Sequence, residues 1–179
     1  YPPERLIKKG ETYTMKQLME RMIIDSDNFA YELIIAEMDQ SILIQVYNDL
    51  DIDIVKLNAE DPDGNILSVK DYPGFFRVLF NASYLSRKNS EEALEMLSKS
   101  AYDQGLVAGT PPDTLVAHKY GERFFSFSGI HQLHDCGVVY NRKSPYLLCI
   151  MTKGNDFEQL EKFIQDTTRI IDEAHTNTP

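Results

Sequence analysis

The chain contains no tryptophan, only two cysteines and no strongly basic or strongly apolar segment. Cys136 and Cys149 are too few for a disulfide scaffold, and we interpret them as buried free thiols, although a hairpin turning near 141–145 would bring their strands side by side. No apolar run approaches the roughly 18 residues of a membrane span. A formal net charge of -10 without a local Lys/Arg cluster disfavours nucleic acid. These absences predict a globular protein that binds neither membranes nor nucleic acids.

The chain also lacks sequence features that would divide it into several domains. With 179 residues and no linker or internal repeat, it is most simply one domain, 1–179. It begins at Tyr1, with neither an initiator Met nor a signal peptide, which is typical of a processed or shortened polypeptide. We therefore expect a single domain that is incomplete at its N-terminus.

Residues from about 14 to 110 have helical periodicity. Thr14 and Gln17 form a capping box ahead of a predicted helix over 15–24, and a second apolar pattern resumes soon afterwards. We expect further helices to begin at Ser41 and at Ser90. The stretch "NAEDPDGN" (58–65) concentrates turn-forming residues and predicts a surface loop. This part of the chain is therefore predicted to be an all-helical lobe.

Residues from about 114 to 179 follow a different pattern. The segments "TLVAHKYGERFFSFS", "HDCGVVYN" and "PYLLCIMTKG" are rich in β-branched and aromatic residues, and they predict three successive antiparallel strands. A last amphipathic helix, which we expect to be capped by Asn155, must cover this sheet. The predicted fold class is α+β: a helical lobe plus an antiparallel sheet covered by a C-terminal helix. Because such a sheet is thin, we expect its N-terminal part to be missing.

Two polar features interrupt these patterns. Ser26, Asp27 and Asn28, called the polar turn from here on, separate two helical stretches and carry side chains that favour caps and turns. Much later, Lys119 lies on the first predicted strand, where its ammonium group supplies fixed positive charge to a cleft. Taken separately, the first feature indicates an ordinary turn, and the second an ordinary edge-strand lysine.

Taken together, the two features point to one family. The segment "YTMKQLMERMIIDSDNFAYELI", followed by "LVAHKYG" and "HDCGVVY", resembles the class A β-lactamases and penicillin-binding protein-like serine hydrolases. In that family a Ser-Asp-Asn stretch of a helical lobe faces a Lys-Thr/Ser-Gly strand across the active-site cleft. The order of elements also matches over nearly the whole chain. The resemblance implies an acyl-enzyme mechanism on a β-lactam or a D-Ala-type peptide.

The resemblance also implies roles for individual residues. Ser26 and Lys119 would be catalytic, with Ser26 in a proton-transfer network and Lys119 stabilising negative charge. Asn28, Tyr120 and Gly121 would bind the substrate, and Asp27 would hold the polar turn. The implied substrate is a small molecule or a peptidoglycan-type compound, and the implied location is extracytoplasmic (periplasmic, cell-surface or secreted).

The chain departs from the family pattern at three places. No Lys has a Ser three residues before it, so the nucleophile of the family's Ser-x-x-Lys motif is expected upstream of this fragment, on a separate N-terminal segment that completes the fold. Tyr120 replaces the small Thr or Ser of the family. The Glu-x-x-Leu-Asn loop of class A enzymes is represented only by Leu57-Asn58, with Ile54 where Glu should stand.

These departures leave an alternative function open. A non-catalytic binding module could retain the penicillin-recognising fold after losing its active site, and this fragment alone is expected to turn over nothing. The sequence predicts no cofactor and no metal site, because His131 and His134 of "HQLHD" would lie on opposite faces of a strand and lack further ligands.

Overall fold

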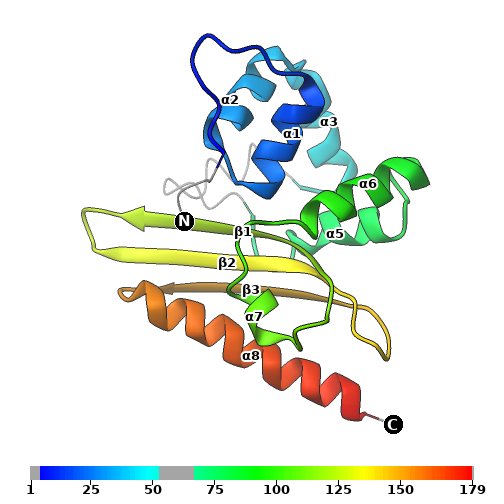
Figure 1. Ribbon diagram of the computed structural model, residues 1–179, viewed down its shortest axis with the longest axis vertical. Coiled ribbons are helices and arrows are strands. Elements are labelled where there is room, and N and C mark those ends of the chain that lie inside the picture. The colour runs from blue at the N-terminus through cyan, green and yellow to red at the C-terminus, as the bar shows by residue number, and fades with distance from the viewer. Residues whose placement is uncertain (1–4, 53–66, 179) are drawn as a thin grey trace.

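The computed structural model describes residues 5–52 and 67–178, and it has an α+β architecture (Figure 1). The helices of the first part are α1 (Met15–Ile24), α2 (Asn28–Glu37), α3 (Gln40–Asp49), α5 (Pro73–Phe80), α6 (Arg87–Leu97) and the short α7 (Leu106–Gly109). They are followed by β1 (Val116–Phe125), β2 (Ile130–Val139), β3 (Tyr146–Gly154) and α8 (Phe157–Asn177). The predicted fold class is therefore confirmed. The loop predicted over 58–65 lies outside the described residues.

The first helix begins where its capping box predicts. The Gln17 backbone N–H donates to Thr14 Oγ1 (3.3 Å), and the Thr14 backbone N–H donates to Gln17 Oε1 (2.9 Å). This reciprocal pair satisfies two donors that a helix N-terminus would otherwise leave open. The predicted bounds of α1, 15–24, are confirmed.

Three other predicted helix starts are wrong. The residues that cap α3, α6 and α8 are Asp39, Ser86 and Asp156, in place of the predicted Ser41, Ser90 and Asn155. In each case the observed cap accepts a hydrogen bond from a backbone N–H of the first turn, at 2.9, 3.2 and 3.1 Å respectively. In each helix the N-cap is therefore a polar residue close to the predicted one, because its side-chain oxygen reaches a backbone N–H group that has no partner within the helix.

The three strands form an antiparallel sheet in the order β1-β2-β3, so that β1 and β3 are its edges. In its register Lys119 lies opposite Cys136, and Cys136 lies opposite Cys149. The two cysteines form a disulfide, so the interpretation as free thiols is wrong. Direct cross-strand pairing brings the two sulfurs together, and this pairing depends on a register that the hairpin prediction alone did not fix.

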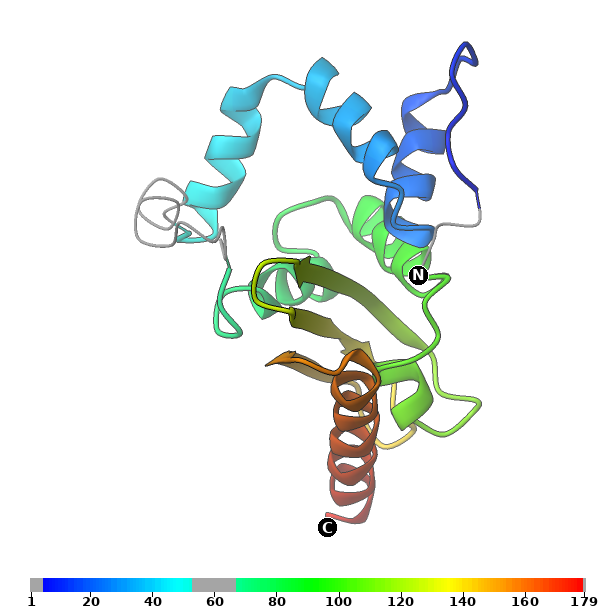
Figure 2. The ribbon, with the colours of Figure 1, turned by 90° about the vertical axis from the view of Figure 1, so that its left-hand side faces the viewer.

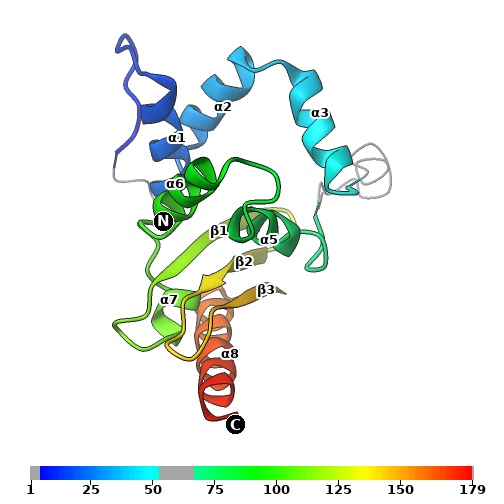
Figure 3. The same cartoon turned by 90° about the vertical axis from the view of Figure 1, so that its right-hand side faces the viewer.

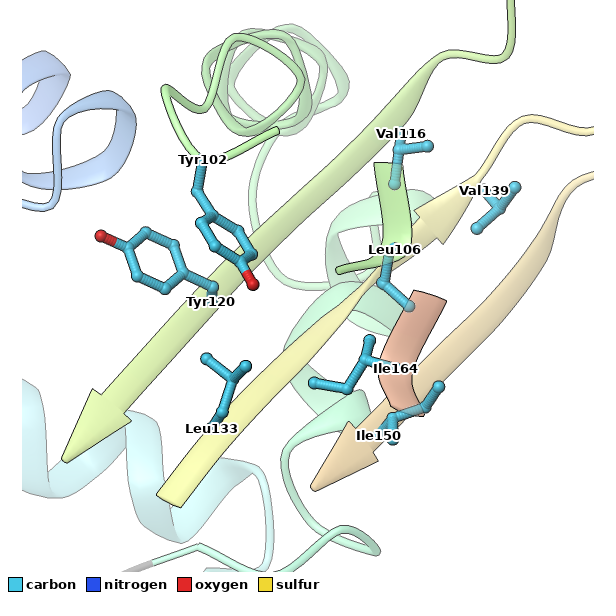
Figure 4. Close-up of a cluster of buried hydrophobic side chains, with 8 residues drawn as sticks. All are labelled: Tyr102, Leu106, Val116, Tyr120, Leu133, Val139, Ile150 and Ile164. Carbon is cyan, nitrogen blue, oxygen red and sulfur yellow. The ribbon is translucent and has the colours of Figure 1, made fainter. Parts of the chain in front are cut away.

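The two faces of the sheet have separate cores. On one face, α7 and α8 cover a cluster of buried side chains (Figures 2 and 4), which consists of Tyr102, Leu106, Val116, Tyr120, Leu133, Val139, Ile150 and Ile164. On the other face, α5 and α6 contribute to a second cluster of Phe76, Leu94, Leu97, Ala117, Cys136 and Val138. The predicted covering of the sheet by the C-terminal helix is thus confirmed.

Helix α3 differs from the other long helices because none of its residues is buried. Figure 3 shows α3 standing beside the sheet and α5 rather than lying on them. Its Tyr47 makes an edge-to-face contact with Phe75 of α5, with 6.3 Å between the ring centroids. Residues of α1, α3 and α5 line a cavity together with Lys119 of β1, and the candidate site lies at one end of that cavity.

Candidate active site

The polar turn is held in an uncommon backbone conformation. Ser26 has a φ of +56°, in the left-handed region that side-chain-bearing residues rarely adopt. Asp27, only 1% exposed, begins α2 by accepting the backbone N–H groups of Phe29 (2.9 Å) and Ala30 (3.3 Å) through Oδ1. Its other oxygen accepts the Ile7 N–H at 2.9 Å. Asp27 therefore ties the turn both to the next helix and to the N-terminal segment.

The structure brings Lys119 of β1 onto this turn. Its Nζ donates to Ser26 Oγ at 2.7 Å and to the Tyr120 carbonyl oxygen at 3.1 Å. The first bond joins residues that are 93 positions apart in the sequence. Because strand residues alternate between faces, Lys119 projects from the face that carries α5 and α6, towards the polar turn. Two residues singled out from the sequence thus share a direct hydrogen bond.

The surroundings of Lys119 change its acidity. Burial lowers the pKa of Lys119 to about 8, because desolvation disfavours the ammonium form, and the negative charge of Asp135 opposes this shift. The ammonium also lies 4.5 Å from the centroid of the Tyr120 ring. Near neutral pH the group is therefore charged for most of the time, yet close to its point of deprotonation.

Tyr120 points to the other face of β1. Its ring stacks on Tyr102 with 4.2 Å between centroids, and its hydroxyl points away from the rest of the cluster (Figure 4). Burial raises the pKa of Tyr120, while a hydrogen bond with the Ser26 side chain acts in the opposite direction. The hydroxyl at position 120 therefore reaches the polar turn from the far end of an aromatic ring.

Gly121 and Asn28 lie beside these groups. A Cβ at Gly121 would meet only His134 Cδ2, at an ordinary 3.9 Å, so neighbouring side chains do not require glycine there. Asn28 is exposed at the first position of α2. The space in front of both residues is open to a ligand.

Two cavities meet at Ser26. The inner cavity, of about 500 Å³, lies in front of the sheet and is lined mainly by apolar and aromatic side chains, with Ser26, Asn28 and Lys119 at its polar end. The outer cavity, also about 500 Å³, is lined by Leu6, Ser26, Asn28, Phe29, Glu32, Tyr120, Gly121 and Glu122. All the residues predicted to form the site line at least one of the two cavities.

A buried pair behind β1 was not singled out from the sequence. His118 Nδ1 lies 2.8 Å from Asp135 Oδ1, and both side chains are almost completely buried. Asp135 also accepts the Leu106 N–H at 2.9 Å and lies opposite Tyr120 in the register. Strand alternation places His118 and Tyr120 on the same face. The identity of the Asp partner, however, required the register of β2.

The histidines that were tested as metal ligands lie apart. His131 packs against Phe124, with 4.5 Å between ring centroids, whereas His134 lies opposite Gly121. Within 5–52 and 67–178 there is no group of three His, Cys, Asp or Glu residues that could hold a metal ion. No described helix is long and apolar enough to cross a membrane. Ile54 and Leu57-Asn58 lie outside the described residues.

Comparison with protein families identifies the chain. Residues 5–174 match the sequence profile of the Beta-lactamase enzyme family. The chain belongs to this family. Among curated protein sequences, none matches it. The family assignment agrees with the resemblance inferred from the polar turn and the Lys119 strand.

Several solved structures share the fold of this chain. PBP-A superimposes with a TM-score of 0.74 at 18% identity, over 96% of this chain and 65% of PBP-A. A mutant of PBP-A, solved as an acyl-enzyme complex with penicillin-G, gives a TM-score of 0.76 at 20% identity, over the same shares of each chain. A class A β-lactamase from Bacteroides cellulosilyticus gives 0.77 at 15% identity, over 94% of this chain and 66% of the other. The chain thus spans slightly less than two thirds of these relatives.

Proposed function

We propose that this chain is the larger part of a serine hydrolase that opens the acyl bond of a β-lactam or a D-Ala-type peptide through an acyl-enzyme. The observation that carries the proposal is the 2.7 Å hydrogen bond between Lys119 Nζ and Ser26 Oγ, where two cavities meet. The nucleophile would be the Ser of a Ser-x-x-Lys motif, which is not among these 179 residues. The substrate would be a small molecule or a peptidoglycan-type compound.

Each residue of the site has a role in this reaction. The Ser26 hydroxyl can both donate and accept, and it would relay a proton to the leaving nitrogen. Lys119 would stabilise the negative charge that develops during acyl transfer and would orient Ser26. Asn28 would bind the substrate amide, and Gly121 would leave space for the substrate beside β1. Tyr120 would offer its hydroxyl at the polar turn, in place of the shorter Thr or Ser of the family.

The inner cavity supports the proposed source of the nucleophile. Most of its lining is apolar, including Ile23, Phe75 and Phe76, although it ends at a hydroxyl and an ammonium group. An amphipathic helix that carries Ser-x-x-Lys would bury its apolar face there and bring its Ser to the polar end. The extra length of PBP-A relative to this chain is compatible with such a segment.

The disulfide supports an extracytoplasmic location for the protein. Disulfides such as Cys136–Cys149 persist in oxidising compartments and are rare where thiols are kept reduced. A periplasmic, cell-surface or secreted protein lies in such an oxidising compartment. Cell fractionation followed by thiol labelling would test the location, and reduced cysteines in a cytosolic pool would contradict it.

Acylation of a longer polypeptide tests the proposed function. The open reading frame upstream of Tyr1 should encode a Ser-x-x-Lys, and the protein that includes it should form a covalent adduct with a chromogenic β-lactam, seen as a burst and by intact mass. Ser26→Ala should slow acylation by about 10²–10⁴-fold. Ser144→Ala, a change at the distant β2–β3 turn, should leave acylation unchanged. A folded protein that contains the motif and forms no adduct at any β-lactam concentration would favour the non-catalytic binding module.

A further inference from the structure

We infer that Ser26 and Lys119 form a nucleophile–base pair of their own, so that the 179-residue chain accepts acyl groups from activated esters on Ser26 Oγ. This activity goes beyond the proposed function, in which Ser26 only relays a proton. It requires no Ser-x-x-Lys motif. Three features of Ser26 support this activity: its contact with Lys119, its access from open space and its backbone conformation.

The first support is the direct contact between a hydroxyl and a base. A serine becomes nucleophilic when a neighbouring group takes its proton, and Ser–Lys pairs occur among such arrangements. Lys119 Nζ lies 2.7 Å from Ser26 Oγ. Its second bond, to the Tyr120 carbonyl at 3.1 Å, fixes the direction of the amine. A neutral amine can keep this second bond as donor while it accepts the Ser26 proton.

The second support is access. Ser26 is half-buried and lines both the inner and the outer cavity, each of about 500 Å³, so a small ester can approach its oxygen from open space. Asn28 lines the same two cavities and offers a side-chain N–H₂ to the oxygen of a tetrahedral intermediate. The reacting oxygen is therefore exposed to a ligand, and the half-buried Lys119 lines the inner cavity beside it.

The third support is the backbone conformation. Ser26, with a φ of +56°, sits at a sharp turn between α1 and α2 although it is not glycine. Strained residues of this kind cost about 1–3 kcal/mol and concentrate at functional sites, where the turn presents a side chain. Here the strain presents the Ser26 hydroxyl to Lys119. A replacement by glycine would relieve the strain and remove the oxygen, which makes it a clean test.

The Lys119 ammonium can lose its proton between neutral pH and pH 9. Burial lowers its pKa to about 8. The other titratable groups around Lys119 and Ser26 include Asp27, Tyr31, Glu32, Tyr47, Tyr72, Tyr120, Glu122 and Asp135. Burial raises the pKa of Tyr47 and Tyr120, and raises that of Tyr72 to about 12, so these phenols stay neutral in this range.

The proposed step balances without another reactant. Neutral Lys119 Nζ takes the proton of Ser26 Oγ while Oγ forms a bond to the carbonyl carbon of the ester. The tetrahedral intermediate collapses, the bond between the carbonyl carbon and the leaving oxygen breaks, and the alkoxide or phenolate departs. Ser26 is left as an O-acyl ester. Lys119 is left as the ammonium form and returns its proton to the leaving group or to water.

p-Nitrophenyl acetate and the intact 179-residue chain supply the test. The release of p-nitrophenolate gives the rate, and peptide mass spectrometry locates the acetyl group. We expect an acetyl group on Ser26 that hydroxylamine removes as an ester, and a rate that rises with pH with a midpoint near 8. An acetyl group found first on Lys119, or no acetyl group on Ser26 in folded protein, would overturn the inference.

Three variants test whether Lys119 acts as a base or only as a positive charge. Lys119→Arg keeps the positive charge but cannot deprotonate, so we expect the rate to fall at least about 100-fold and the midpoint to disappear. Ser26→Gly should remove the adduct, and Ser26→Cys should restore it as a thioester. Ser144→Ala is the matched control, because Ser144 Oγ also lies near a basic nitrogen, 3.0 Å from His175 Nε2; it should leave Ser26 labelling unchanged.

The results of the Ser26 acetylation experiment can be distinguished from those of the β-lactam experiment that tests the proposed function. Equal labelling of Ser26 in Lys119→Arg and in the unchanged chain would remove Lys119 as the base. A failure here would leave the β-lactam prediction intact, because that prediction is measured on the Ser of a Ser-x-x-Lys motif in a longer polypeptide. Conversely, Ser26 labelling in a protein that no β-lactam acylates would support this inference alone. Circular dichroism of each variant confirms that the helices are retained.

Discussion

Replacing Asp27 by alanine removes three hydrogen bonds from the polar turn at once. The carboxylate accepts the N–H groups of Phe29 and Ala30, which caps α2, and that of Ile7 from the N-terminal segment. Loss of an N-cap costs about 1 kcal/mol. The part-buried Ile7 N–H, left without its acceptor, adds about 1–3 kcal/mol. We therefore expect Asp27→Ala to lower the free energy of unfolding by about 2–4 kcal/mol, and Tm by roughly 4–16 °C.

Urea unfolding followed by circular dichroism measures this loss. Asp27→Asn divides it into two parts, because the amide oxygen can still cap α2 whereas the amide nitrogen cannot accept the Ile7 N–H. We expect about half of the loss in that variant. Asp39→Ala is the matched control, since Asp39 caps α3 through one N–H at an exposed position. If Asp27→Ala destabilises the chain no more than Asp39→Ala does, Asp27 does not hold the turn as described.

Three further predictions concern the sheet. Gly137→Ala should destabilise the chain by about 1–3 kcal/mol, because the new Cβ would lie 2.5 Å from Ala117 O, whereas Gly121→Ala should cost nothing measurable in the same denaturation assay. Replacing Cys136 and Cys149 by alanine should cost about 3 kcal/mol; dithiothreitol should abolish the difference from the unchanged chain, and a difference that persists would contradict the disulfide. The depressed pKa of Lys119 means that the unfolded chain binds more protons between pH 8 and 10, so stability should rise across that window by up to about 3 kcal/mol. Denaturation of Lys119→Met should lack this rise and show only the fall that the raised tyrosine pKa values cause as pH approaches 10; a slope equal to that of the unchanged chain would assign the effect to another group.

The sequence predicts those parts of the fold that depend on local periodicity. The capping box of Thr14 and Gln17 places α1, because both partners lie within one turn of helix. Helix starts at Asp39, Ser86 and Asp156 were missed because several polar residues compete at each boundary and only the backbone geometry selects one. The Cys136–Cys149 disulfide was missed for a related reason, since only the register makes these two residues direct neighbours.

The candidate site could be predicted in part. The polar turn and the Lys119 strand were recognisable because each breaks a regular pattern, and the structure joins them through one hydrogen bond. The pairing of His118 with Asp135 and the stacking of Tyr120 on Tyr102 could not be predicted. These contacts depend on which strands and loops meet, whereas the alternation of a single strand indicates only the face on which each residue lies.

Lys119, Cys136 and Cys149 lie side by side across the three strands, and the disulfide among them limits the movement of the sheet. The disulfide between these directly opposed residues prevents β2 from slipping along β3. A slip by one residue would move every side chain of the strand to the other face of the sheet. The strand that carries the Lys119 ammonium, β1, pairs directly with this cross-linked hairpin. The Ser26 hydroxyl that meets the ammonium lies outside this cross-linked hairpin, on the left-handed turn between α1 and α2, so the disulfide does not restrain it.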